Sequence, residues 1–277
     1  MNYFLNSELI NKTIKECELP HITGLSRTES LRLILSCLDL TSLEGSDHDE
    51  KIIDFCIKAK SFNNFNLPNV AAVCVYPVFA RLVRKNLENS NIKTACVAGA
   101  FPAGQSPLNI RLDEVKFAVD EGAQEIDMVI SRGRFLQGDY DYITKEIDLT
   151  KKACGNAHLK VILETGELGS NENIRKASNL AIEAGADFIK TSTGKIKPAA
   201  TFEAVVVMLE TIKEHYLKTG KMIGIKPAGG ISEPDQAILY ANLVERILGK
   251  SWLNNHYFRI GASRLTDNIV KEFQTNQ

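Results

Sequence analysis

The sequence has no long apolar run and no excess of charge of either sign. None of its 277 residues belongs to a stretch approaching the roughly 18 to 20 consecutive apolar residues of a membrane span. Residues 1–16 mix charged with apolar residues, so we do not expect them to act as a secretion signal. The 33 lysines and arginines against 34 aspartates and glutamates leave a net charge of -1. This balance provides no basic field for nucleic acid or an anionic membrane. We therefore expect a cytoplasmic protein whose partner is a small molecule.

Patterns for disulfides and for metal binding are also missing. The six cysteines are widely spaced without a C-x-x-C pair, and three of them lie within apolar runs. We expect them to be reduced thiols of the core. The five histidines form neither an H-x-H nor an H-E-x-x-H pattern, so a histidine metal site is not expected.

Eight short apolar runs recur along the chain, and an amphipathic segment follows each one. They cover residues 31–40, 70–77, 93–99, 125–130, 159–164, 187–193, 222–227 and 257–263. Their near-continuous apolarity is typical of parallel strands that are covered on both faces. Segments such as 112–119 and 174–184 repeat apolar residues every three or four positions, as helices do, and residues 4–17 predict one extra helix before the first strand.

Eight strand-helix units in about 250 residues predict an α/β fold, the (β/α)8 or TIM barrel, with an extra N-terminal helix. A doubly wound open sheet is the alternative, although it usually has fewer strands. No linker rich in Ser, Gly or Pro divides the chain. We therefore expect residues 1–277 to form a single domain.

Lys190 lies inside one of the predicted buried strands, in the stretch D-F-I-K-T-S-T-G-K at 187–195. Burying an ammonium group is costly unless it is paired. Lys226 lies in the next predicted strand, and Asp127 lies between apolar neighbours in another. Two lysines at one barrel mouth would lower the pKa of at least one of them, and a neutral lysine is a nucleophile for Schiff bases. Structural ion pairs with Asp127 or Glu164 are the alternative.

Glycine-rich loops follow the last two predicted strands. Gly229 and Gly230 lie in one loop, and Gly261 to Ser263 lie in the other. In beta-alpha barrels these two loops often bind phosphate through free backbone N–H groups, although glycines also serve ordinary turns. Lys195 is expected to direct a cation at an anionic or hydroxylated substrate. Asp39, near the end of the first strand, has two open interpretations: a site residue, or a residue of a turn or helix cap.

Eight motifs, in order and over nearly the whole chain, resemble the deoxyribose-phosphate aldolase family. They are CLDLT (37–41), VCVYP (73–77), FPAGQ (101–105), EIDMVI (125–130), LETGEL (163–168), ADFIKTSTGK (186–195), IKPAGGI (225–231) and FRIGAS (258–263). FPAGQ and residues 152–160 are closest to the eukaryotic branch. The resemblance implies a class I lyase without metal or cofactor, which reversibly cleaves 2-deoxy-D-ribose 5-phosphate to acetaldehyde and D-glyceraldehyde 3-phosphate.

The resemblance also assigns roles to individual residues. Lys190 would form the Schiff base, Lys226 would lower its pKa and help to move protons, and Asp127 would be the acid-base partner. The residues expected to contact substrate hydroxyls or ordered water are Asp39, Thr41, Thr193 and Lys195. Those expected to hold the phosphate are Gly194, Gly229, Gly230, Gly261 and Ser263. The only partner implied is the sugar phosphate, apart from a second copy of the chain in a homodimer.

The sequence departs from the family pattern at several positions. Arg264 stands where a small hydroxyl residue is usual, and residues 271–277 (KEFQTNQ) contain no tyrosine, although several members have one in the tail. Ile225, Ala199 and Ala100 are further replacements. These departures leave a second hypothesis, a catalytically weakened relative that acts as a binding or regulatory protein. A third is a phosphate-binding barrel of other chemistry, for example an isomerase with Asp127 or Glu164 as its base.

Overall fold

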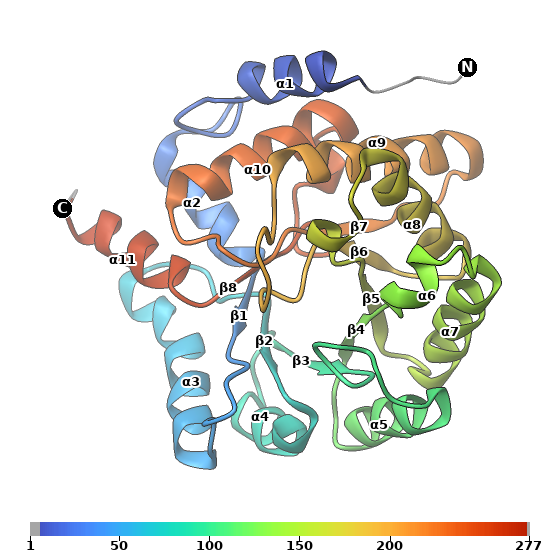
Figure 1. Ribbon diagram of the computed structural model, residues 1–277. Helices are drawn as coiled ribbons and strands as arrows, with labels where there is room; N and C mark the ends of the chain where they lie inside the picture. Colours follow the sequence, from blue (N-terminus) through green and yellow to red (C-terminus); the bar gives the residue numbers. More distant parts are fainter. Residues whose placement is uncertain (1–5, 276–277) are drawn as a thin grey trace.

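The chain folds around eight parallel strands, which a ring of helices surrounds (Figure 1). The structure is a computed structural model and describes residues 6–275. The strands are β1 (Leu38–Thr41), β2 (Ala72–Val75), β3 (Lys93–Ala98), β4 (Glu125–Val129), β5 (His158–Ile162), β6 (Phe188–Lys190), β7 (Gly224–Lys226) and β8 (Ile260–Ala262). Nearly every strand residue is buried, as expected for strands covered on both faces.

Each strand is hydrogen-bonded to its neighbours in sequence order, and β1 also pairs with β8. Two isolated parallel bridges, Ile225 with Phe258 and Ala228 with Gly261, connect β7 to the β8 segment and close the circle. The predicted (β/α)8 barrel is therefore confirmed. Closure brings the carboxyl ends of all eight strands to one mouth, which is where barrels of this kind place their active sites.

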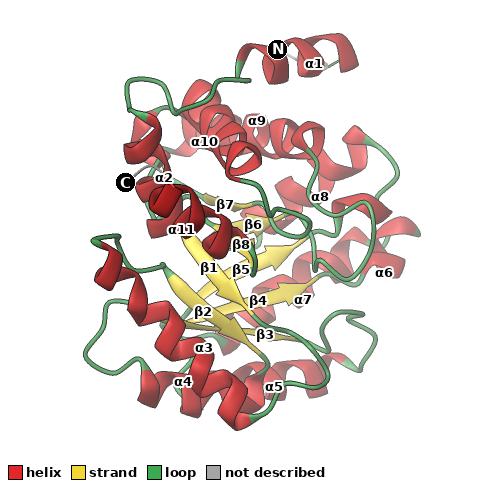
Figure 2. Cartoon of the chain, turned by 90° about the vertical axis from the view of Figure 1, so that its left-hand side faces the viewer, coloured by secondary structure: helices red, strands yellow, loops and turns green. Residues whose placement is uncertain are grey.

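The helices lie outside the strands (Figure 2). Eight of them follow the strands in turn, with the short α6 (Arg132–Leu136) in addition: α3 (Asp49–Ser61), α4 (Ala80–Asn86), α5 (Leu108–Asp120), α7 (Tyr140–Ala153), α8 (Asn171–Glu183), α9 (Phe202–Thr219), α10 (Pro234–Leu248) and α11 (Leu265–Thr275). Short 3-10 turns occupy Phe62–Phe65, Pro77–Phe79, Thr165–Glu167 and Lys250–Trp252. No helix within residues 6–275 combines the length and the apolarity that crossing a membrane requires.

Two helices precede the first strand, and one of them corrects the sequence prediction. The extra N-terminal helix is α1 (Ser7–Glu16), which packs against α9 and α10 outside the ring; residues 4 and 5 of its predicted range lie outside the described residues. The run 31–40, predicted as a strand, belongs up to Ser36 to helix α2 (Arg27–Ser36). Ser26 and Glu29 form a capping box that begins this helix, and its buried residues 31, 34 and 35 have helical spacing.

Gly224 gives a test of the packing inside the barrel. A Cβ atom at this position would lie 2.3 Å from Cε1 of the buried Phe188 ring on the adjacent strand. We expect Gly224→Ala to lower the free energy of unfolding in urea by about 1–3 kcal/mol, because the ring has to leave its rotamer or the strands have to separate. Gly45→Ala is the matched control, since nothing lies within 4 Å of a Cβ there. Equal stability of both variants would contradict this account of the packing.

Candidate active site

Lys190, Lys226 and Asp127 meet inside the barrel. Lys190 ends β6 and lies in register with Lys226, which ends β7, while Asp127 is the central residue of β4. Nζ of Lys190 and Nζ of Lys226 each lie 2.7 Å from the same carboxylate oxygen, Oδ2 of Asp127. All three side chains are buried. One carboxylate oxygen therefore connects two amino groups that are close enough to influence each other's protonation.

Lys160, from the middle of β5, occupies the other oxygen of Asp127. Its Nζ donates to Asp127 Oδ1 at 3.1 Å and to Glu125 Oε2 at 2.6 Å, and its side chain is completely buried. Asp127 thus accepts hydrogen bonds from three lysines. With both of its oxygens occupied, the carboxylate is fixed in orientation and cannot rotate away from Lys190.

Arg259 and Asp39 complete this cluster. The guanidinium of Arg259 spans two carboxylates: Nη1 lies 2.6 Å from Asp39 Oδ1, and Nη2 lies 2.7 Å from Glu125 Oε1. The other oxygen of Asp39 lies 2.5 Å from Nζ of Lys226, as an ion pair without hydrogen-bond alignment. Lys226 is therefore held between two carboxylates, whereas Lys190 forms an ion pair with Asp127 alone.

The charges of this cluster favour a neutral Lys190. Three carboxylates (Asp39, Glu125, Asp127) face four basic groups (Lys160, Lys190, Lys226, Arg259), so full ionisation would leave one positive charge in excess. An uncompensated buried charge is costly. Loss of one proton would leave three of each sign. Lys190, with a single carboxylate partner, is the group that gives up a proton most easily.

The pKa shifts follow the same division. Burial and the nearby charge of Lys226 lower the pKa of Lys190, although Asp127 partly opposes them. Burial also acts to lower the pKa of Lys226, but Asp127 and Asp39 outweigh it and raise that pKa above the ordinary value. Against the effect of burial, three lysines hold the pKa of Asp127 well below its usual range. The site therefore pairs a lysine inclined to be neutral with one that keeps its charge.

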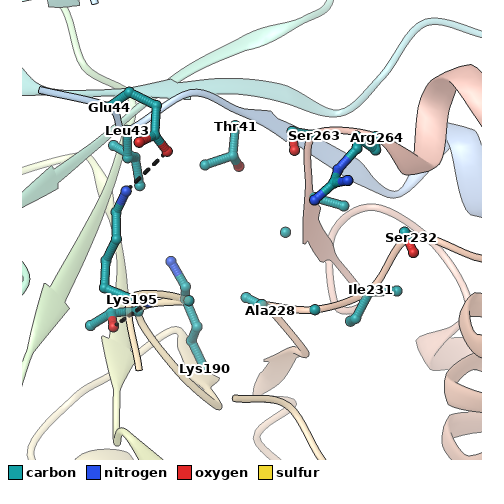
Figure 3. A pocket seen from close by; sticks show the side chains of 16 residues that line it. Thr41, Leu43, Glu44, Lys190, Lys195, Ala228, Ile231, Ser232, Ser263 and Arg264 are labelled. Atoms are coloured by element: carbon teal, nitrogen blue, oxygen red, sulfur yellow. Dashed lines mark hydrogen bonds and ion pairs between the residues drawn. The ribbon is translucent and has the colours of Figure 1, made fainter. Parts of the chain in front are cut away.

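Above Lys190 a cavity of about 220 Å³ opens at the barrel mouth (Figure 3). Nine residues predicted from the sequence line it: Lys190, Thr41, Thr193, Gly194, Lys195, Gly229, Gly230, Gly261 and Ser263. Arg264 lines it too. The other three predicted residues, Asp39, Asp127 and Lys226, are not part of the lining and lie in the buried cluster.

Two loops of the cavity wall come into van der Waals contact through glycines. Gly194, after β6, has φ +78°, and Gly229, after β7, has φ +87°. A Cβ at Gly229 would lie 2.8 Å from Cα of Gly194 and 2.7 Å from Cβ of Ala199. Only glycine permits this approach at these backbone angles. Neither glycine adds a side chain of its own over the backbone N–H groups of these two loops.

Glu164 fixes the loop that carries Thr193. Its backbone is left-handed, with φ 56°, and its buried carboxylate accepts hydrogen bonds from the Thr193 hydroxyl at 2.5 Å and the Thr193 N–H at 3.1 Å. Arg132 forms an ion pair with the same carboxylate at 3.2 Å. Burial raises the pKa of Glu164, in opposition to the Thr193 hydrogen bonds. Because Thr193 Oγ1 also accepts from the Lys195 N–H at 3.1 Å, Glu164 sets the path of the whole loop.

Sequence reasoning did not identify Lys160, Glu125 or Arg259 as members of the site. Each is a charged residue in or beside an apolar strand, which is the same signal that pointed to Lys190. The resemblance motifs even contain Glu125 and Arg259. Successive strand residues point alternately into the barrel and towards the helices. The register of the strands is therefore needed to show that the charged groups of Lys160, Glu125 and Arg259 meet at the centre of the barrel. Within residues 6–275, no three His, Cys, Asp or Glu side chains are grouped so that they could hold a metal ion.

Comparison with known proteins adds the following findings. A model of the DeoC/LacD family of aldolases matches residues 33–244. The deoxyribose-phosphate aldolase of Homo sapiens is 45% identical over 247 residues, which is 85% of this chain and 78% of the human protein. The Mus musculus protein of the same name is 44% identical, with the same coverage. A solved deoxyribose phosphate aldolase from Aeropyrum pernix, 23% identical, shares the fold with a TM-score of 0.71 over 96% of this chain and 99% of that one.

Proposed function

This chain belongs to the DeoC/LacD family of aldolases, and from that premise we propose that it is a class I deoxyribose-phosphate aldolase. The reaction is the reversible cleavage of 2-deoxy-D-ribose 5-phosphate to acetaldehyde and D-glyceraldehyde 3-phosphate. The observation that supports it most strongly is the position of Lys190, whose amine reaches the floor of the cavity while its pKa is lowered. A buried lysine beside a second cation is a recognised route to a Schiff-base nucleophile.

In this mechanism the neutral amine of Lys190 attacks the aldehyde carbon of the open-chain sugar. Loss of water from the adduct gives an iminium ion. The C3 hydroxyl then loses its proton, the C2–C3 bond breaks, and its electron pair moves into the iminium to give an enamine. D-Glyceraldehyde 3-phosphate leaves at this point. A proton returns to C2, and water hydrolyses the resulting iminium to acetaldehyde and free Lys190.

Asp127 and Lys226 serve the proton transfers. The carboxylate of Asp127 lies 2.7 Å from both amines, so it can exchange protons with Lys190 while Lys226 replenishes them. Lys226 also keeps a positive charge beside Lys190, which favours the neutral amine before attack. Asp39 holds Lys226 from the opposite side. We propose that the remaining predicted residues of the cavity wall bind the sugar hydroxyls and the phosphate.

A steady-state assay tests this proposal. The protein with deoxyribose 5-phosphate is expected to release acetaldehyde and glyceraldehyde 3-phosphate in equal amounts, with turnover that EDTA does not reduce. Absence of cleavage by folded protein would refute the proposed activity. No observation on residues 6–275 favours the regulatory relative, because the buried charged cluster around Lys190 is complete.

The pH dependence of kcat/KM follows from the lowered pKa of Lys190. Only the neutral amine attacks, so kcat/KM is expected to rise with pH as Lys190 loses its proton, and to level off above its pKa. Because burial and Lys226 lower that pKa, the midpoint should lie below the ~10.4 of a free lysine. A pH-rate profile with deoxyribose 5-phosphate measures it. A midpoint at or above that of free lysine would contradict the activation of Lys190.

We also propose in which compartment, and with which partners, the enzyme acts. All six cysteines are free and buried thiols, which agrees with the reducing cytoplasm. We propose that residues 1–277 act as one domain on a free sugar phosphate, without nucleic acid and without a metal or cofactor. The homodimer that the family resemblance implies remains a prediction.

A further inference from the structure

The cavity mouth carries two side-chain cations besides Lys190, and Lys195 is the one that is already paired. Its Nζ lies 3.0 Å from Oε1 of Glu44, which comes from the loop after β1 (Figure 3). The backbone is anchored at both ends of this ion pair. The N–H of Glu44 donates to the Asp47 carboxylate at 3.0 Å, and the N–H of Lys195 donates to Thr193 Oγ1 at 3.1 Å. Hydrogen bonds therefore anchor the backbone at both ends of the pair, while the side chain of Glu44 is 63% exposed.

Arg264 is the second cation, and its charge is not compensated. It directly precedes α11 and lies beside Ser263, with its guanidinium directed into the cavity (Figure 3). Among the described residues, no ion pair or side-chain hydrogen bond involves Arg264. Glu44 is the only carboxylate among the residues that line the cavity, and it is bound to Lys195 across the mouth. The mouth thus has a neutral end and a cationic end.

We propose that Glu44 and Arg264 together determine the orientation of the substrate. Glu44 cancels the charge of Lys195, so an anionic group is directed to Arg264 and the neighbouring loop of Gly229 and Gly230. An arginine can bind a phosphate through two parallel N–H···O bonds, whereas glycine loops offer only backbone N–H groups. The neutral hydroxyls of the sugar then face the Lys195–Glu44 pair. That the ligand is a sugar phosphate rests on the proposed function. The division of the mouth into a neutral end at Lys195 and Glu44 and a cationic end at Arg264 does not depend on it.

Binding of inorganic phosphate tests the division of charge without turnover. By titration calorimetry, Arg264→Ser is expected to weaken phosphate binding about 10- to 100-fold, the usual effect of losing a charge-assisted contact. Glu44→Gln should strengthen it roughly 3- to 10-fold, because Lys195 becomes a second free cation. In the double variant Lys195 should replace part of the lost contact, so phosphate binds more tightly than to Arg264→Ser alone.

The matched controls remove the same charges at exposed sites away from the mouth. Arg246→Ser acts on α10, where Arg246 faces Glu16, and Asp148→Asn breaks the surface pair of Asp148 with Lys152. Both are expected to bind phosphate as the unchanged protein does. Phosphate binding by Arg264→Ser that equals that of the controls would overturn the proposal, as would a Glu44→Gln variant that binds phosphate no more tightly.

Kinetics supply a second readout of orientation. With Glu44 changed to Gln, the phosphate can also bind at Lys195 with the aldehyde away from Lys190. Such non-productive binding lowers kcat and KM by the same factor, about threefold here, and leaves kcat/KM within a factor of two. Arg264→Ser should instead reduce the preference for deoxyribose 5-phosphate over unphosphorylated deoxyribose about 10- to 100-fold. A Glu44→Gln variant with lowered kcat/KM and unchanged KM would contradict the orienting role.

The two proposals can fail separately. If the unchanged protein does not cleave deoxyribose 5-phosphate but phosphate binding follows the expected pattern, the aldolase activity is refuted and the charge division stands. If the protein is an active aldolase and Arg264→Ser leaves phosphate binding and the phosphate preference unchanged, only the orientation proposal is refuted.

Discussion

Replacing Lys190 by alanine is expected to lower kcat for deoxyribose 5-phosphate by on the order of 10⁴-fold or more, since it removes the only amine in contact with both the cavity and Asp127. The chain should remain folded. Asp127 keeps its hydrogen bonds to Lys160 and Lys226, and the cluster is left with three charges of each sign. Steady-state kinetics and urea unfolding of the purified variant measure the two effects.

Lys152→Ala is the control for loss of a lysine. Lys152 lies on the surface of α7 and pairs with Asp148 four residues earlier, so its removal should leave kcat unchanged. If Lys190→Ala kept more than about a hundredth of the activity, Lys190 would be excluded as the Schiff-base nucleophile.

Asp127→Asn is expected to lower kcat about 10²- to 10⁴-fold, the usual contribution of a positioned acid-base group. Its effect on pH dependence distinguishes its role. Asp127 raises the pKa of Lys190, so the neutral amide should lower that pKa further, and the midpoint of kcat/KM should move to lower pH. Activity would fall although Lys190 is more often neutral. That combination assigns Asp127 to proton transfer rather than to activation of the amine.

Lys226→Met provides the opposite shift. Lys226 lowers the pKa of Lys190 through like-charge repulsion, so without it the midpoint should move to higher pH. pH-rate profiles of both variants measure the two shifts together. Midpoints that moved in the same direction would contradict the assignment of opposite electrostatic effects to Asp127 and Lys226.

The barrel and the three central residues could be predicted from the sequence for one physical reason. Ionised side chains in apolar strands are too costly to occur without a partner, so Lys190, Lys226 and Asp127 were conspicuous. The strands could be recognised because both of their faces are buried, which gives near-continuous apolar runs in the sequence. A near-continuous apolar run was the criterion for a strand, and it failed for residues 31–40. Such a run occurs in buried helices as well as in strands, and most of this one belongs to helix α2.

The charge distribution at the mouth could not be predicted in this way. Glu44 and Lys195 are 151 positions apart and meet only because β1 and β6 end at the same mouth. The sequence suggested that Lys195 directs its cation at the substrate, whereas in the structure Glu44 already pairs with it. Asp39 was expected to contact substrate hydroxyls or ordered water, and it lies outside the cavity lining, between Lys226 and Arg259. Its contact with substrate hydroxyls or ordered water stays a prediction.

The claim that Lys190 is the Schiff-base nucleophile is tested most directly by trapping. The protein is incubated with acetaldehyde or deoxyribose 5-phosphate, reduced with sodium borohydride and digested with a protease. The masses of its peptides are then measured by mass spectrometry. We predict one substrate-dependent adduct, on the peptide that contains Lys190, formed in parallel with loss of activity and absent from Lys190→Ala. No adduct at all, or an adduct on Lys226 or Lys195 with Lys190 unmodified, would contradict it.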